Sequence, residues 1–187
     1  MTSDFIVGMK VDGTSYADAS GRILEWAERR CSRYVCVATV NNVMEAWDSA
    51  EFRRVMNEAD LVTPDGMPLV WGLKLLGRTE ATRVYGPDLT PVVLRKAAEQ
   101  GVPVGFYGGS PAVLARLQEV VRARFPRLQI AYAFSPPFRP LTVSDSTAPS
   151  PLRVPTRCSL APIWQTFLFQ PRSLDVWSPL VPAKPRN

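Results

Sequence analysis

The chain has 187 residues, enough for one domain with a real hydrophobic core and too few for two of ordinary size. Its apolar fraction of 46% and charged fraction of 21% are typical of a soluble globular protein, and no apolar run reaches the roughly 18 residues of a membrane-spanning helix. The N-terminal sequence lacks the basic and apolar regions of a signal peptide, so we expect a cytoplasmic protein.

The net charge of +5 comes mainly from the C-terminal part of the chain. Residues 1–134 carry 16 basic and 15 acidic side chains, whereas residues 135–187 carry six and two. The first part therefore has no strong basic bias, and we expect no nucleic-acid partner. Cys31, Cys36 and Cys158 are too few for a disulfide framework and lack metal-ligand spacing, which favours reduced thiols.

The first 134 residues alternate between strand-like and helix-like patterns. A strand begins at Phe5, a turn follows at Asp12-Gly13, and Thr14 or Ser15 can cap the next helix. The predicted helices cover residues 14–30, 44–59, 67–76, 87–100 and 110–125. The predicted strands cover residues 5–7, 34–40, 59–63, 102–107 and 128–134. This alternation, with nearly continuous apolar strands, predicts an α/β fold: a Rossmann-like parallel sheet flanked by helices.

The pattern changes after residue 134. Eleven of the 18 prolines lie in residues 135–187, and neither helical nor strand periodicity persists at that density. We therefore expect an α/β domain over residues 1–134, followed by a proline-rich, basic tail over residues 135–187 that is disordered or aberrant.

Ligands of open parallel sheets bind at the carboxyl ends of the strands, and three groups of residues occupy such places. The first group is Thr39 with Asn41, at the end of the strand predicted from residue 34. If the extended geometry continues, these two side chains point to the same side and can line a pocket. The same residues are also ordinary for a turn that caps the next helix.

The second group is Asp65 with Gly66, which places one carboxylate between two apolar runs. Because the chain has no histidine, proton transfer near neutral pH needs another residue type, and Asp65 is a candidate general base. Partial burial would raise its pKa toward a useful range, and Gly66 would let a ligand approach the backbone. The run Pro64-Asp65-Gly66 is equally ordinary turn chemistry.

The third group is the glycine turn Gly108-Gly109, between a strand and a helix. Free backbone N–H groups and the positive end of the helix suit a phosphate, although the spacing matches neither a dinucleotide motif nor a P-loop. A tight strand-to-helix turn explains these glycines equally well. Arg83 can neutralise a diphosphate, but a solvated arginine is the commoner case.

Three segments, taken in order, resemble the WecG/TagA/CpsF family of bacterial glycosyltransferases. They are TVNNVMEAWDSAEFRRVMNEADLVTPDGMPLVWGLKLLG, then RVYGPDL, then GFYGGSP followed by a helix and FPRLQIAYAF. The resemblance covers about residues 5–140, or roughly three quarters of the chain.

The resemblance implies an inverting, metal-independent enzyme without a cofactor, which transfers a hexose such as N-acetylmannosamine in cell-surface polysaccharide synthesis. The donor would be a UDP-sugar. The acceptor would be a saccharide linked to a polyprenyl diphosphate, namely undecaprenyl diphosphate. By resemblance Asp65 is the catalytic base, Thr39, Asn41 and Arg83 bind substrate, and Gly108-Gly109 lie near the nucleotide. Peripheral contact with the inner face of the cell membrane and a homo-oligomer are also expected.

The chain departs from the family after the FSPPFRP segment. The family continues there with a further helix, a Gly-x-Pro-Lys-Gln-Glu-like motif and more helices, and residues 141–187 contain no such motif. We therefore expect a sheet and a donor pocket that are incomplete at the C-terminus, with a tail translated in a shifted reading frame as one explanation. The alternative function is a truncated, inactive protein that still binds a nucleotide sugar.

Overall fold

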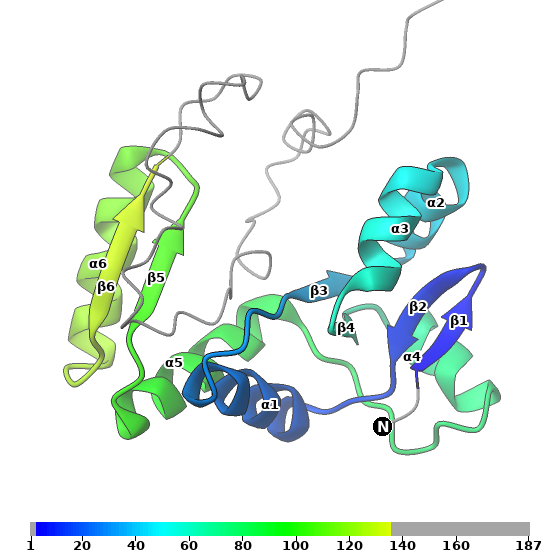
Figure 1. Cartoon of the computed structure of the whole chain (residues 1–187), viewed down its shortest axis with the longest axis horizontal. Coiled ribbons are helices and arrows are strands. Elements are labelled where there is room, and N and C mark those ends of the chain that lie inside the picture. The colour runs from blue at the N-terminus through cyan, green and yellow to red at the C-terminus, as the bar shows by residue number, and fades with distance from the viewer. Residues whose placement is uncertain (1–2, 136–187) are drawn as a thin grey trace, which may run out of the picture.

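The computed structural model, which describes residues 3–135, alternates between strands and helices that occur singly or in consecutive pairs (Figure 1). The strands are β1 (Ser3–Ile6), β2 (Met9–Asp12), β3 (Val35–Ala38), β4 (Leu61–Pro64), β5 (Val104–Tyr107) and β6 (Ile130–Phe134). The helices are α1 (Tyr16–Glu28), α2 (Val40–Asp48), α3 (Ala50–Glu58), α4 (Met67–Leu75), α5 (Gly86–Gln100) and α6 (Pro111–Arg124). Almost all of the predicted tail lies outside the described residues, so the division into two parts stays a prediction.

The described strands form three pairs. β3 and β4 are parallel, with Val35 opposite Leu61 and Ala38 opposite Pro64, and β5 and β6 are also parallel. Helices connect the strands of each parallel pair, because α2 and α3 link β3 to β4, and α6 links β5 to β6. This arrangement confirms the predicted α/β class with parallel strands flanked by helices.

Two hydrophobic clusters cover the two faces of the β3–β4 pair. Val35 and Leu61 belong to a cluster with residues of α1, α5, β5 and α6, whereas Cys36 and Val62 belong to a second cluster with residues of β2, α2, α3 and α4. Successive side chains of a strand point to opposite faces, so a strand that is buried on both faces needs a continuous apolar run. This requirement explains why all of β4 is buried.

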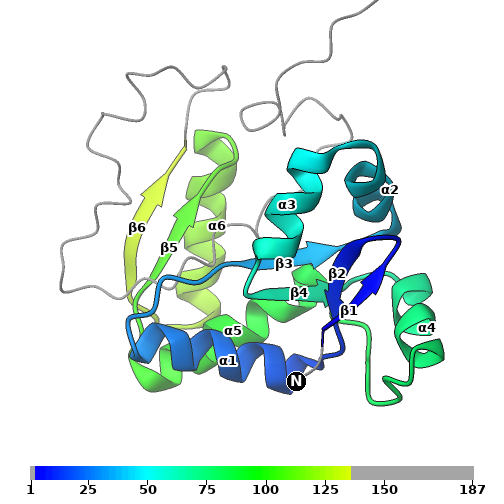
Figure 2. The same cartoon turned by 45° about the vertical axis from the view of Figure 1, so that its right-hand side comes forward.

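The β5–β6 pair and the β1–β2 hairpin lie toward opposite ends of the molecule. The two views agree that α1 and α5 lie between these ends, below the β3–β4 pair (Figures 1 and 2). Helices α1 and α5 pack against each other and supply many residues of the first cluster. The carboxyl ends of β4 and β5 therefore lie in different parts of the fold.

The N-terminal strand belongs to a hairpin that the sequence analysis did not predict. β1 pairs antiparallel with β2, and the connection at Val7 and Gly8 has positive φ values of 50° and 81°. Met9 and Val11 are fully buried and anchor β2, and Asp12, which the sequence analysis placed in a turn, is the last residue of this strand.

The single helix predicted over residues 44–59 was also wrong, because α2 and α3 are separate. Ser49 between them is extended (φ −123°, ψ 111°), and its hydroxyl accepts a hydrogen bond of 3.2 Å from the Phe52 N–H. The first of these helices also starts earlier than predicted, since β3 ends at Ala38 and α2 begins at Val40.

Neither Cys31 nor Cys36 forms a disulfide within residues 3–135, and Cys36 is buried. Burial raises the pKa of the Cys36 thiol to about 12, so this side chain stays protonated and behaves as a small apolar group. Cys158 lies outside the described residues.

Candidate active site

The parallel pairing of β3 and β4 brings their carboxyl ends to one edge. Ala38 lies opposite Pro64 in the register, and the Asp65 N–H donates a hydrogen bond of 2.8 Å to the Ala38 carbonyl. Thr39 directly follows Ala38, and Asp65 directly follows Pro64, so Thr39 and Asp65 are neighbours at this edge. Two of the predicted site residues come together for this reason.

Thr39 caps α2 rather than extending β3. Its N–H and its hydroxyl both donate to the Asn42 side-chain oxygen, each at 2.8 Å. The condition that the extended geometry continues from Thr39 to Asn41 is not met, because Asn41 is already in the first turn of α2 and is exposed. The other interpretation, a turn that caps the next helix, agrees with the contacts of Thr39 with Asn42. A role of Thr39 and Asn41 in substrate binding stays a prediction.

Asp65 lies in a partly buried position between β4 and α4. Its side chain is 15% exposed, and Oδ1 pairs with Nη2 of Arg83 at 3.2 Å. Nε of Arg83 also donates to the Asp65 backbone carbonyl, so one guanidinium holds both the main chain and the side chain. Oδ2 of Asp65 has no hydrogen-bond partner among residues 3–135.

Burial raises the pKa of the Asp65 carboxyl group above its usual value. The hydrogen bond and the positive charge of Arg83 act in the opposite direction, and the negative charge of Asp88 adds to the rise. The net direction is upward because desolvation is the largest of these effects. A carboxylate with a raised pKa is a better proton acceptor than an exposed aspartate, which is the property that a general base requires.

The segment that carries Arg83 is fixed beside the end of β4. The Val84 N–H donates to the Pro64 carbonyl at 2.8 Å, which places the residue before it next to Asp65. The Arg83 guanidinium lies over the Tyr85 ring, 4.6 Å from its centroid. This stacking restricts a side chain that is otherwise 47% exposed.

Three residues that the sequence analysis did not assign to the site connect this segment to α1 and α5. The Tyr16 hydroxyl accepts a hydrogen bond of 3.0 Å from the Tyr85 N–H and donates one of 3.5 Å to Oδ2 of Asp88. Tyr85 and Asp88 both fall in the RVYGPDL segment, so their order along the chain was a usable signal. Tyr16 offered none, because it lies 69 positions from Tyr85.

The glycine turn Gly108-Gly109 lies away from this site. Both glycines have positive φ values, 109° and 71°, as a tight turn between β5 and α6 requires. Ser110 caps α6 by accepting from the Val113 N–H, and Ser135 donates to the Gly109 carbonyl. No hydrogen bond or ion pair within residues 3–135 joins this turn to Asp65, and the ends of β4 and β5 are apart in both views (Figures 1 and 2).

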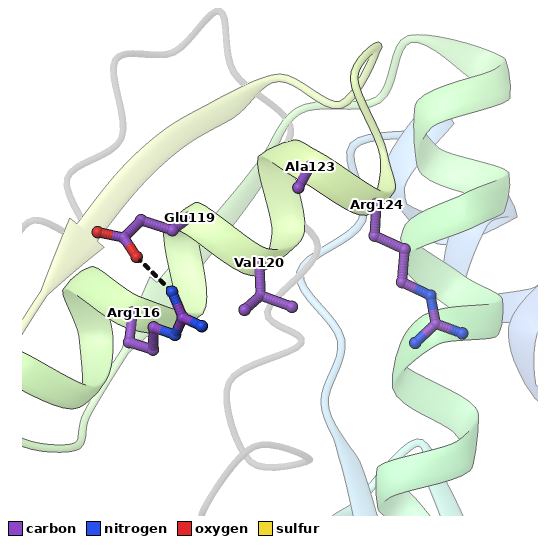
Figure 3. Close-up of a pocket in the computed structure, with 5 residues that line it drawn as sticks. All are labelled: Arg116, Glu119, Val120, Ala123 and Arg124. Atoms are coloured by element: carbon purple, nitrogen blue, oxygen red, sulfur yellow. Dashed lines mark hydrogen bonds and ion pairs between the residues drawn. The ribbon is translucent and has the colours of Figure 1, made fainter.

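An open hollow of about 500 Å³ lies along α6 rather than at the Asp65 edge (Figure 3). Its lining side chains are Arg116, Glu119, Val120, Ala123 and Arg124. Arg116 and Glu119 form an ion pair with each other at 2.9 Å. The hollow contains none of the predicted site residues, and its charged groups are exposed, so it adds nothing to the candidate site.

The described residues contain no helix that is both long and apolar enough to cross a bilayer. They also contain no cluster of three or more His, Cys, Asp or Glu side chains placed to hold a metal ion. The Asp65–Arg83 pair at the carboxyl edge of the β3–β4 strand pair, a carboxylate beside a cation, is the candidate site.

The protein is of the α/β class, in which ligands commonly bind at the carboxyl ends of parallel strands, and the Asp65–Arg83 pair lies at such an edge. Residues 5–149 match the sequence profile of the "Glycosyl transferase WecG/TagA/CpsF family", and the chain belongs to this family. The family proposed from the sequence is thereby confirmed.

A relative from Bacillus spizizenii is 33% identical over 98 residues. It is named "N-acetylglucosaminyldiphosphoundecaprenol N-acetyl-beta-D-mannosaminyltransferase". The matched part is 52% of this chain and 38% of the relative, so the chain spans well under half the length of the curated relative that it matches.

Proposed function

We propose that this protein is an inverting glycosyltransferase that uses a UDP-sugar donor and a polyprenyl-diphosphate-linked saccharide acceptor. The transferred sugar would be N-acetylmannosamine or a related hexose, and the product would serve cell-surface polysaccharide synthesis. Family membership supports the reaction class, and the name of the relative supports an acceptor of this chemistry. The observation that carries the proposal is the position of Asp65, partly buried at the strand edge with one carboxylate oxygen paired and the other open.

In this reaction Asp65 acts as the general base. Oδ2 accepts the proton of the acceptor hydroxyl, whose oxygen attacks the anomeric carbon of the donor sugar while the bond to the UDP oxygen breaks on the opposite face. The raised pKa of Asp65 favours this proton transfer. Arg83 keeps the carboxyl group in place through its contacts with Oδ1 and with the backbone carbonyl.

Negative charge develops on the diphosphate as the bond breaks, and a cation is needed to stabilise it. The Arg83 guanidinium is half-exposed, so it can contact a diphosphate while it remains stacked on Tyr85. Metal independence stays part of the proposal. Thr39 and Asn41 are proposed to line the acceptor side of the site, next to Asp65.

The decisive experiment measures UDP release by the full chain with a UDP-hexose and a polyprenyl-diphosphate-linked N-acetylglucosamine. Asp65→Asn should lower the rate by about 100-fold or more, because loss of a general base has effects of that order. Asp48→Asn is a matched control, since Asp48 is exposed at the end of α2 and should leave the rate unchanged. Equal rates for wild type and Asp65→Asn would refute the assignment of the base.

One observation favours a second candidate function, a non-catalytic module that binds a nucleotide sugar. The glycine turn, which the family resemblance places near the nucleotide, lies away from Asp65, so a nucleotide bound at that turn would not bring its sugar to the candidate base. Such a module would gain thermal stability from UDP or a UDP-sugar, with no release of UDP in the presence of the acceptor. Release of UDP that depends on the acceptor and on Asp65 would eliminate this candidate.

A further inference from the structure

Helix α4 is apolar on its outward side as well as on its buried side. Leu69, Val70 and Leu73 are buried in the fold. Trp71 and Leu75, four residues apart and therefore on one side of the helix, are 59% and 89% exposed. A helix that is apolar all round is normally enclosed by protein or by lipid, so this exposed side calls for an apolar partner.

The charges on α4 indicate which kind of surface this partner presents. Lys74 is the one charged residue of α4, it is exposed, and it makes no ion pair within residues 3–135. Helix α2 provides a contrast, because it carries an exposed tryptophan, Trp47, but its two charged residues, Glu45 and Asp48, are both exposed carboxylates. An anionic surface would attract the outward side of α4 and repel that of α2.

The position of α4 relative to the candidate base is also informative. The helix begins two residues after Asp65, and nine residues at 1.5 Å each give it a length of about 13 Å. Both views place α4 beside the hairpin at one end of the molecule, with its outward side free of the other described elements (Figures 1 and 2). A surface in contact with α4 therefore lies close to Asp65.

We propose that the α4 face, formed by Met67, Trp71, Lys74 and Leu75, is the surface by which this protein binds an anionic lipid bilayer. The proposal rests on the proposed function, because a lipid-linked acceptor presents its diphosphate and sugar at the bilayer surface. The indole ring of Trp71 suits the interface, the Leu75 side chain enters the acyl region, and the Lys74 ammonium group contacts lipid phosphates. The acceptor sugar would then reach Asp65 without leaving the bilayer surface.

The test measures binding of the full chain to vesicles of phosphatidylglycerol and phosphatidylethanolamine by co-sedimentation. Trp71→Ala and Leu75→Ala should each weaken binding by about tenfold, because a buried apolar side chain of this size contributes that much. Trp47→Ala is the matched control, since Trp47 has nearly the same exposure, 61%, on the acidic helix α2, and it should bind like wild type. Lys74→Gln should weaken binding to these vesicles and have little effect on binding to neutral phosphatidylcholine vesicles.

Brominated lipids in the same vesicles report which tryptophan enters the bilayer, because bromine quenches tryptophan emission at short range. Quenching should be lost in Trp71→Ala and kept in Trp47→Ala. Quenching that persists in Trp71→Ala would overturn the proposal, because another tryptophan would then make the contact. Equal losses of vesicle binding in the two variants would overturn it as well.

The competing occupant of the α4 face is a second copy of the chain. If Leu75→Glu turns a dimer into a monomer in light scattering while vesicle binding is unchanged, the face is a dimer interface and the proposal fails. The vesicle assay needs no turnover, so it separates this inference from the proposed function. If vesicle binding depends on Trp71 but the chain releases no UDP, the result supports the α4 face as the membrane-binding surface and refutes only the proposed enzymatic function.

Discussion

At the scale of single residues, Asp65 experiences two opposing influences. Burial raises the pKa of its carboxyl group, the neighbouring Arg83 opposes that rise, and Asp88 adds to it, with an upward net direction. A group whose pKa rises on folding binds its proton more tightly in the folded chain than in the unfolded one. The ionised carboxylate that a general base requires is therefore destabilising at neutral pH, which is a common cost of a functional site.

Asp65→Asn should for this reason keep or raise the melting temperature at pH 7. The carboxyl group of Asp65 has a higher pKa in the folded chain than in the unfolded chain. Between these two pKa values the folded chain binds more protons than the unfolded chain, so the free energy of unfolding of the wild type falls as pH rises through this window. The asparagine variant has no such loss, so its advantage over wild type should grow from acidic to neutral pH. Differential scanning calorimetry across that range measures the trend, with Asp48→Asn as the control. An advantage that shrinks toward neutral pH would mean that the fold favours the charged form.

Tyr85 should influence Asp65 through Arg83, because its ring carries the guanidinium at 4.6 Å. Tyr85→Leu removes this platform, weakens the contact of Arg83 with the carboxylate, and should raise the Asp65 pKa further. Tyr85→Phe keeps the ring and should leave the pKa at its wild-type value. Carbon-13 NMR titration of the Asp65 carboxyl carbon follows both variants. Arg83→Gln should produce at least the rise seen with Tyr85→Leu, and a smaller rise would contradict this mechanism.

The residues of the candidate site differ in how far sequence could predict them. Asp65 follows an apolar run that had to be a buried strand, so its place at the strand edge could be predicted from pattern alone. The contact between Asp65 and Arg83 could not be predicted from this pattern, because it depends on the path of the chain after α4. Gly108-Gly109 followed the same strand-end rule, but strand ends meet only within one paired sheet, and β5 pairs with β6 rather than with β4.

At the scale of the elements, the caps decided where helices begin and end. Helical periodicity continues from α2 into α3 without a glycine or proline, so the sequence predicted one helix where there are two. The signal that separates them is Ser49 with Phe52 three residues later, a local hydrogen bond that competes with helix continuation. Similarly, β2 is only four residues long, and its two buried apolar side chains, Met9 and Val11, are too few to reveal a strand by alternation.

Ser49→Ala should lower the free energy of unfolding by about 1 kcal/mol, because the Phe52 N–H loses its side-chain acceptor at the start of α3. Ser32→Ala is the control, since Ser32 is exposed and lies outside any helix or strand. Urea denaturation followed by circular dichroism gives both values. Equal values for the two variants would mean that water or a continued helix satisfies the Phe52 N–H.

At the scale of the whole molecule, one buried carboxylate joins the hairpin to the parallel strands. Asp12 is 4% exposed at the end of β2, and its two oxygens accept from the Ser3 hydroxyl and from the Val62 N–H, both at 2.6 Å. β2 packs beside β4 without forming a ladder with it, so this side chain replaces the missing strand pairing at that point. The hairpin in turn covers the second hydrophobic cluster, which contains residues of β4 and α4 on either side of Asp65.

Asp12→Ala should therefore lower the free energy of unfolding by about 2 kcal/mol, since it leaves a buried backbone N–H of β4 without its charged acceptor. Asp48→Ala, which removes an exposed carboxylate, should change it little. Native-state hydrogen exchange distinguishes local from global loss: the Val62 amide and the amides of β2 should exchange faster in Asp12→Ala, while those of β5 and β6 keep their wild-type order of protection. If all strands lost protection equally, the hairpin would be part of a single cooperative core rather than an attached cover. If the β2 amides were unaffected, hydrophobic contacts of Met9 and Val11 alone would hold the hairpin against β4.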